Sequence, residues 1–257
     1  MTKTIERAGS VVYDLIEEIG KVVVLSYQVM KAAFRRPLYL KELVNQMEGF
    51  GVRSLPVVLT TSLFTGAVLA VQTYIGFKRF SAESMVGTVV ALSLTRELGP
   101  VVTGLIVAGR VGASMTAEIG TMRVTEQIDA LITLSMNPVK YLIVPRVIAG
   151  FIMMPVLTLF ADAVGIWAGF MVSIHSLGAN RVVYIRRSLD FLTFHDVTSG
   201  LYKAAVFGII IALIGCYKGF YTRGGAEGVG RATTGSVVVS SILILIANYV
   251  MTAVFFH

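Results

Sequence analysis

Five apolar segments, each long enough to cross a lipid bilayer, constrain this chain more than any other feature of its sequence. They lie at 54–77, 84–113, 143–174, 204–222 and 236–256. A helix rises about 1.5 Å per residue, so about 20 apolar residues cover the roughly 30 Å of hydrocarbon in a bilayer. The sequence therefore predicts an all-α, polytopic membrane protein with five transmembrane helices, and we expect one domain over residues 1–257.

The composition also argues against a soluble protein. The chain is 55% hydrophobic and 14% charged, whereas soluble chains carry about 25% charged residues. A net charge of +7 would suggest nucleic-acid binding in a soluble protein. Here the Lys and Arg residues flank apolar segments, where such residues set topology and meet anionic lipid. We therefore expect no nucleic-acid partner.

The segment 1–36 predicts an amphipathic helix on the membrane surface rather than a further span. Its apolar side consists of Val12, Leu15, Ile16, Ile19 and Val23. Most basic residues lie in this segment and in the loops after the second and fourth spans. By the positive-inside rule, this bias predicts a cytoplasmic N-terminus and an extracytoplasmic C-terminus. The segment 178–199 then lies outside, where we expect a short helix.

The loop after the second span carries the pattern of an amphipathic helix, in the sequence AEIGTMRVTEQIDAL. We take Thr121 as its N-cap, and Asn137-Pro138 as its end, because proline cannot continue a helix. Its apolar face consists of Val124, Ile128, Leu131 and Ile132. A capped amphipathic helix between two spans is well suited to binding another protein. We therefore predict that 117–138 is a cytoplasmic segment that docks on a partner.

Arg96 and Glu97 place two charges within the second span, at a cost of several kcal/mol unless they meet a cavity or a partner. Adjacent helical residues point about 100° apart, so these two do not neutralise each other face to face. One interpretation is a polar patch on a substrate path. The other is a structural pair between helices, with Lys203 as the partner. Gly99-Pro100 directly afterwards predicts a kink.

The end of the first span carries an apolar stripe that contains one amide. It consists of Leu69, Gln72, Phe77 and Phe80. The stripe either packs against neighbouring helices or forms a groove for acyl chains, with Gln72 and Tyr74 as polar contacts. Two pairs of small residues, Gly165 with Gly169 and Gly215 with Gly219, mark close contacts between helices.

Several familiar catalytic and nucleotide-binding motifs are absent from the sequence. It contains no H-E-x-x-H zinc site, no G-x-S-x-G nucleophile elbow and no P-loop. The glycine-rich stretch from Thr222 to Ser236 does not follow a strand, so we predict a flexible cytoplasmic loop there. We expect no catalytic residue, no metal and no cofactor on this chain.

Three blocks of sequence resemble the MlaE (YrbE-type) permeases, the membrane subunits of Mla-type ABC lipid transport systems. They are the long block from Ala91 to Arg146, VGIWAGF at 164–170 and GVGRATTGSVVVSS at 228–241. The blocks follow the family's order, and the resemblance covers nearly the whole chain. One departure is Asn248, at a position where some members of the family carry an acidic residue.

The resemblance implies a homodimeric permease in the bacterial inner membrane that moves glycerophospholipids. It also implies a cytoplasmic P-loop ATPase that holds ATP and Mg, a STAS-domain protein, and a hexameric MCE-domain carrier on the periplasmic side. A phospholipid would lie between two permease chains. The expected role is lipid exchange between the inner membrane and the carrier, which contributes to outer-membrane lipid asymmetry.

The resemblance further implies two sets of functional residues. The lipid cavity would be lined by Leu69, Gln72, Tyr74, Phe77, Phe80, Arg96 and Glu97. The ATPase-coupling residues would be Glu118, Arg123, Glu126 and Asp129. Two rival functions remain open on the residues alone. One is a proton-coupled secondary transporter of a lipophilic substrate that uses Glu97, and the other is a scaffold that only anchors an ATPase.

Overall fold

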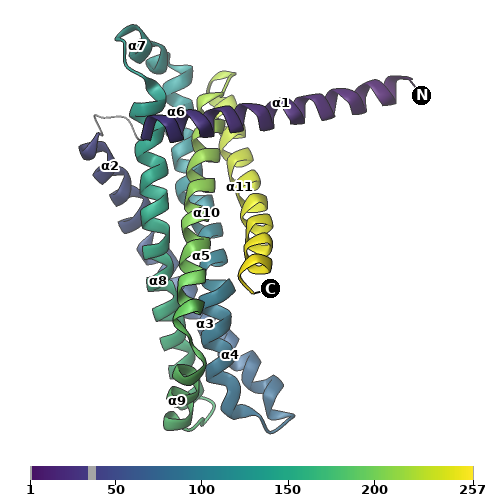
Figure 1. Ribbon diagram of the computed structural model, residues 1–257, viewed down its shortest axis with the longest axis vertical. Coiled ribbons are helices and arrows are strands. Elements are labelled where there is room, and N and C mark those ends of the chain that lie inside the picture. Colours follow the sequence, from purple (N-terminus) through teal and green to yellow (C-terminus); the bar gives the residue numbers. More distant parts are fainter. Residues whose placement is uncertain (1, 34–38, 257) are drawn as a thin grey trace.

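A computed structural model describes residues 2–33 and 39–256, and over this part of the chain every regular element is a helix. Five of its helical units are long and apolar enough to cross a membrane, and they form an elongated bundle (Figure 1). These units are Leu40–Lys78, Glu83–Val124, Val139–His175, Phe194–Phe220 and Gly225–Phe255. The prediction of an all-α protein with five candidate spans is confirmed.

Several spans consist of shorter elements that follow one another with little or no interruption. The first contains α2 (Leu40–Met47), η1 (Glu48–Val52) and α3 (Leu55–Lys78). The second contains η2 (Glu83–Met85), α4 (Val86–Ser93), η3 (Leu94–Leu98), α5 (Gly99–Val107), η4 (Ala108–Gly112) and α6 (Ala113–Val124). The third contains η5 (Val139–Ile143) and α8 (Val144–His175), and the last two are α10 (Phe194–Phe220) and α11 (Gly225–Phe255). Among the described residues, three helices lie outside these spans: α1 (Thr2–Ala33), α7 (Gln127–Thr133) and α9 (Arg181–Phe191).

The last two spans begin earlier than their apolar segments. Thr193 caps α10 in a capping box with Asp196, so this helix starts well before residue 204. The prediction of a flexible glycine-rich loop is wrong, because α11 already begins at Gly225. The turn before it ends at Gly224, whose φ of +91° suits a residue without a side chain. The prediction from glycine content alone therefore placed the start of this helix too late in the sequence.

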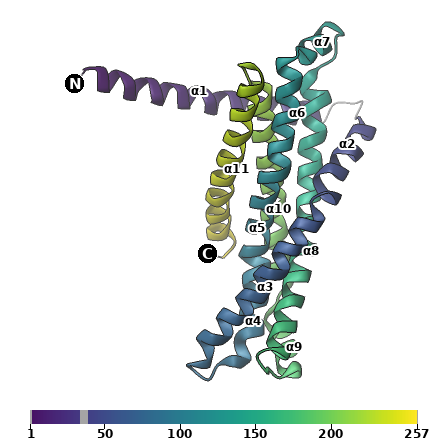
Figure 2. The ribbon, with the colours of Figure 1, turned by 180° about the vertical axis from the view of Figure 1, so that it is seen from behind.

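Helix α1 runs across the bundle rather than along it, close to the end that carries α7 (Figures 1 and 2). Its C-terminal part buries Leu25, Val29 and Ala32 in one apolar cluster with residues of α6, α7, η5 and α10. Ile16 and Ile19, on the predicted apolar side, are exposed. Residues 34–36 and the side chains of Val12 and Leu15 lie outside the described part of the chain. An apolar face without protein cover, on a helix that runs across the spans, fits a helix on a membrane surface.

Small residues allow α3 and α8 to pack closely. A side chain at Gly66 would overlap the backbone of Gly165, and Ser62 donates a hydrogen bond to the Ala161 carbonyl. A Cβ atom at Gly219 would lie 2.9 Å from the Thr116 carbonyl oxygen on α6. The predicted close contacts at these glycines are confirmed. In a membrane, where neighbouring helices gain little from hydrophobic burial, such close packing is a main source of association.

Gly66→Ala is expected to destabilise the fold by about 2 kcal/mol or more, because the new methyl group has only backbone atoms to displace. The measurement is the midpoint of thermal unfolding in detergent. Gly76→Ala is the matched control, since it lies on the same helix with nothing within 4 Å of the added atom. Equal unfolding midpoints for the two variants would contradict the close α3–α8 contact.

Candidate functional site

The π-helical element η3 positions Arg96 and Glu97 in the second span. The Gly99 N–H donates to the Leu94 carbonyl five residues earlier, and Pro100 then begins α5. The irregularity predicted at Gly99-Pro100 thus takes the form of a widened helical turn. Gly99 is required here, because a side chain would overlap the carboxylate of Asp162 on α8. Single π-helical turns inside longer helices often lie at functional sites.

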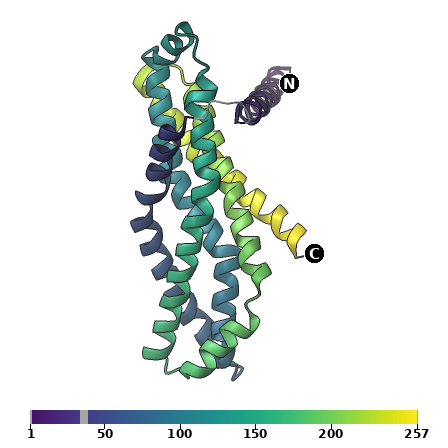
Figure 3. The same cartoon turned by 60° about the vertical axis from the view of Figure 1, so that its left-hand side comes forward.

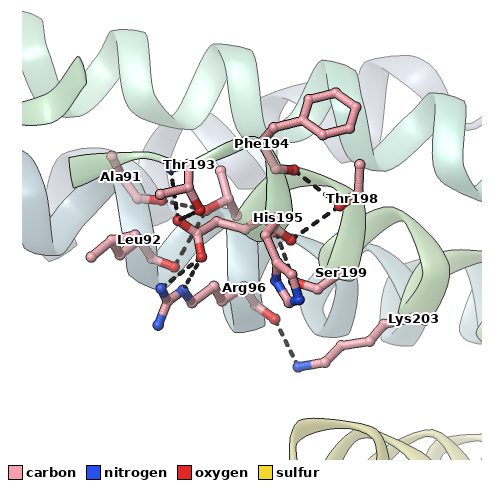
Figure 4. A network of polar contacts seen from close by, with 11 residues as sticks. Ala91, Leu92, Arg96, Thr193, Phe194, His195, Thr198, Ser199 and Lys203 are labelled. Carbon is pink, nitrogen blue, oxygen red and sulfur yellow. Dashed lines mark hydrogen bonds and ion pairs between the residues drawn. The ribbon is translucent and has the colours of Figure 1, made fainter. Parts of the chain in front are cut away.

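Arg96 joins η3 to the start of α10 (Figure 4). Its Nη2 atom lies 2.6 Å from Asp196 Oδ1, and its Nε donates to the same oxygen at 2.7 Å. The other carboxylate oxygen of Asp196 accepts from the backbone N–H and the hydroxyl of Thr193, at 2.9 and 2.8 Å. The side chain of Asp196 is only 2% exposed, whereas that of Arg96 is 36% exposed. The guanidinium is therefore fixed on one side and accessible on another.

Glu97 joins the second, fourth and fifth spans. Lys203 Nζ lies 2.7 Å from Glu97 Oε1, and Thr252 Oγ1 donates to that oxygen at 2.9 Å. Asn248 Nδ2 donates to Glu97 Oε2 at 2.8 Å. The side chain of Lys203 is fully buried and also donates to the Arg96 carbonyl. The predicted pair between Glu97 and Lys203 is present, and Asn248 replaces the expected acid with a hydrogen-bond donor.

These residues form a compact polar cluster, which we call the charge cluster: Arg96, Glu97, Asp196, Lys203, Asn248 and Thr252. Its two cations match its two anions, which lowers the cost of placing charges between membrane-spanning helices. Figure 3 shows α11 leaning away from the other spans toward its C-terminus, where the charge cluster holds it. Arg96 also lies 4.5 Å from the centre of the Phe256 ring, at the end of α11. The arrangement can offer a donor and an acceptor to a polar headgroup at its exposed edge.

The predicted acyl-chain residues of α3 are divided between two environments. Leu69, Tyr74 and Phe77 pack against an apolar cluster of α3, α4, η3 and α9. Gln72 and Phe80 are exposed instead, Phe80 to 80%. The packing interpretation thus accounts for the first three within a single chain. Leu94 of η3 belongs to the same apolar cluster. These three residues therefore pack near the element that carries Arg96 and Glu97.

The predicted continuous helix from Thr121 to residue 135 is wrong. Helix α6 runs from the second span through Thr121 to Val124, and α7 begins only at Gln127. Glu126 stands between them in the left-handed region, with φ of +60°. The helix continues through Gly120, which is buried, so Thr121 lies inside α6 and is not an N-cap. The result is a sharp corner at the tip of the bundle (Figure 1).

The predicted coupling residues surround this corner, although not as a single face. Arg123 Nη1 and Asp129 Oδ1 lie 2.7 Å apart and join α6 to α7, and Glu126 is exposed. Ile128 is buried in the apolar cluster that also contains residues of α1. Glu118 lies one helical turn before Met122 and pairs at 2.7 Å with Arg146. The corner is thus anchored to the bundle below and exposes charged groups above.

Sequence reasoning missed three residues that complete these sites. The capping-box spacing from Thr193 to Asp196 offered a signal for the partner of Arg96. Arg146, with a side chain only 1% exposed, stands inside the apolar run IVPRVIAG, where an isolated charge already requires a partner. Thr252 carried no signal, because a threonine in an apolar helix commonly bonds its own backbone.

The chemistry possible at these sites is limited by the groups present. Within the described residues, no group of three or more His, Cys, Asp or Glu side chains could hold a metal ion. The charge cluster contains no cysteine or histidine nucleophile. Its side chains can therefore bind and orient a polar group and can respond to helix movement.

Comparison with known proteins places the chain among membrane permeases. A family model described as Permease MlaE matches residues 43–254. A probable ABC transporter permease protein of Rickettsia conorii is 55% identical over 240 residues, which cover 93% of each chain. The intermembrane phospholipid transport system permease protein MlaE of Haemophilus influenzae is 37% identical, over 98% of this chain and 97% of that protein. The chloroplastic protein TRIGALACTOSYLDIACYLGLYCEROL 1 of Arabidopsis thaliana is 38% identical, over 92% of this chain and 67% of that protein.

Proposed function

Since the chain belongs to the MlaE permease family, we propose that it is the membrane subunit of an ABC transporter that moves glycerophospholipids. The charge cluster is the observation that supports a phospholipid as the substrate. A guanidinium held by a buried carboxylate, yet 36% exposed, can bind the phosphate of a lipid headgroup within the membrane. Glu97, also partly exposed, can accept from the remainder of the headgroup.

The proposed partners, which the family membership suggests, bind the two ends of the bundle. The α7 end lies in the cytoplasm and docks on a P-loop ATPase, which holds ATP and Mg and can be joined by a STAS-domain protein. The α9 end faces a hexameric MCE-domain carrier in the periplasm, and the exchange contributes to outer-membrane lipid asymmetry. Helix α11 exposes many apolar side chains, among them Ile242, Leu245 and Tyr249. Lipid and a second copy of the chain would cover them in a homodimer.

In this proposal the chain binds and moves lipid and performs no covalent chemistry. ATP binding on the partner moves the α6–α7 corner, which is packed on α1 and α10. The same second span carries Arg96 and Glu97, which hold α10 and α11. Movement of this span therefore changes the distance between the helices that hold the headgroup.

The test is ATP-dependent exchange of a labelled phospholipid between proteoliposomes that contain the complex and an added carrier. We expect exchange to require ATP, the ATPase and the permease, and we expect phospholipid to co-purify with the complex. Mass spectrometry after gentle purification identifies the proteins and lipids present. Exchange that follows a proton gradient without ATPase would favour the secondary-transporter alternative. A complex with bound ATPase but without lipid or exchange would favour the scaffold.

A further inference from the structure

A pair of arginines, separate from the charge cluster, lines a pocket between the first and second spans. The pocket has a volume of about 430 Å³ and lies beside η1 and η4. Arg53 directly follows η1, and Arg110 lies within η4. Both elements are π-helical, like η3 at the charge cluster. Two guanidinium groups from different helices therefore meet at one pocket, each next to a helical irregularity of the kind found at binding sites.

Positive charge prevails in this pocket. Arg53 contacts Glu48 at 3.3 Å, with both side chains more than half exposed, and such a pair contributes little. Arg110 Nη1 donates to the buried hydroxyl of Ser54 at 3.0 Å, which leaves its charge uncompensated by that contact. Glu118 is the acidic residue of the lining, and Arg146 pairs with it at 2.7 Å.

The rest of the lining suits an amphiphile with an anionic head. The amides of Asn45 and Gln46 and the hydroxyl of Ser114 add neutral polar groups around the arginines. Phe50, Val111 and Met115 are the larger apolar residues that border the same pocket. Arginine binds phosphate through paired hydrogen bonds. The pocket lies on candidate membrane spans. A phosphate compound that carries an apolar group and reaches a pocket there is a membrane lipid.

We propose that this pocket binds the phosphate of a glycerophospholipid from the leaflet at the α7 end. The site is separate from the charge cluster, because Arg110 lies about 21 Å along the helix from Arg96. It goes beyond the proposed function, since binding here does not depend on whether the bound lipid is transported. The pocket also extends to Glu118, so a lipid in it contacts the helix that leads to the α6–α7 corner.

The experiment is native mass spectrometry of the purified protein in detergent, titrated with dioleoyl phosphatidylglycerol. We expect the variant R53Q/R110Q to bind lipid at this site at least about tenfold more weakly, because two charge-assisted contacts are lost. Glutamine at 110 still offers a donor to Ser54, which protects the fold. R96Q should weaken the binding of a different lipid molecule, the one at the charge cluster. Combining all three substitutions should therefore abolish lipid binding at both sites. R186Q/R187Q is the control, since this basic pair lies on α9 at the other end of the bundle.

Two further probes identify the source of the phosphate. Dioleoylglycerol, which lacks the phosphate, should bind the wild-type site weakly, and millimolar inorganic phosphate should not displace phosphatidylglycerol. Displacement by inorganic phosphate would overturn the lipid assignment in favour of a soluble anion. If R53Q/R110Q binds phosphatidylglycerol as tightly as the wild type, the proposed site is overturned. The same holds if the double substitution weakens only the association of two chains and leaves lipid binding unchanged. Neither outcome depends on ATP-driven exchange, so failure here is distinguishable from failure of the proposed function.

Discussion

Replacing Lys203 with methionine is expected to destabilise the folded protein by about 3 kcal/mol and to abolish ATP-driven lipid exchange. The fully buried ammonium is the cation that pairs with Glu97, and removing one member of a buried pair leaves the other without compensation. The expected loss lies at the lower end of the range for such pairs, because Glu97 keeps part of its surface exposed. Thermal unfolding in detergent measures stability, and proteoliposome exchange measures transport.

The double variant E97Q/K203M separates the two interpretations of the charge cluster. Removing both charges eliminates the unpaired carboxylate, so we expect most of the lost stability to return. If the cluster acts on the lipid headgroup, exchange stays at background although the protein is stable. Recovery of exchange together with stability would show that the pair only holds helices together, and the headgroup role of Glu97 would have to be abandoned.

The sequence predicted the helices better than their joints. Apolar length and charge bias are local properties, so the five spans could be read directly. The corner at Glu126 could not, because a left-handed residue between two helices depends on the burial of Ile128 beside α1. Likewise, glycines at 225–230 suggested a loop, although packing and the span itself keep them helical. These joints are set by tertiary contacts that no window of residues contains.

The charge cluster illustrates the same limit at the level of the site. Arg96, Glu97 and Lys203 were visible because charges are conspicuous in apolar segments. Asn248 was noted only as a departure from the family, and its role as a donor to Glu97 required the neighbouring helix. Thr252 lies one turn further along α11 and bonds the same carboxylate. Uncharged residues of other spans that bond to a charged residue are therefore the part of a membrane site that sequence patterns do not predict.

Reversing the charge of Glu126 is expected to reduce ATP-driven exchange by at least about tenfold while leaving the membrane fold intact. Glu126 is exposed at the tip of the bundle, so its substitution changes the docking surface rather than the core. Loss of one interfacial charge contact costs about 1.4 kcal/mol or more, which corresponds to about tenfold in affinity. The measurement is recovery of the ATPase with E126K, together with exchange. E126G is the matched control for backbone strain, because glycine adopts the observed φ of +60° freely.

The pair between Arg123 and Asp129 tests whether the shape of the corner matters apart from its charge. R123D should open the contact between α6 and α7 and lower exchange, since the 2.7 Å ion pair becomes a repulsion. The swap R123D/D129R restores an ion pair across the turn with the same net charge as the wild type. Recovery of ATPase binding and exchange in the swap would assign these residues to holding the corner, with Glu126 left as the contact to the partner. A swap variant that folds normally yet stays inactive would instead mean that the ATPase contacts Arg123 or Asp129 directly. The movement of the ATPase would then be transmitted to the permease through this ion pair.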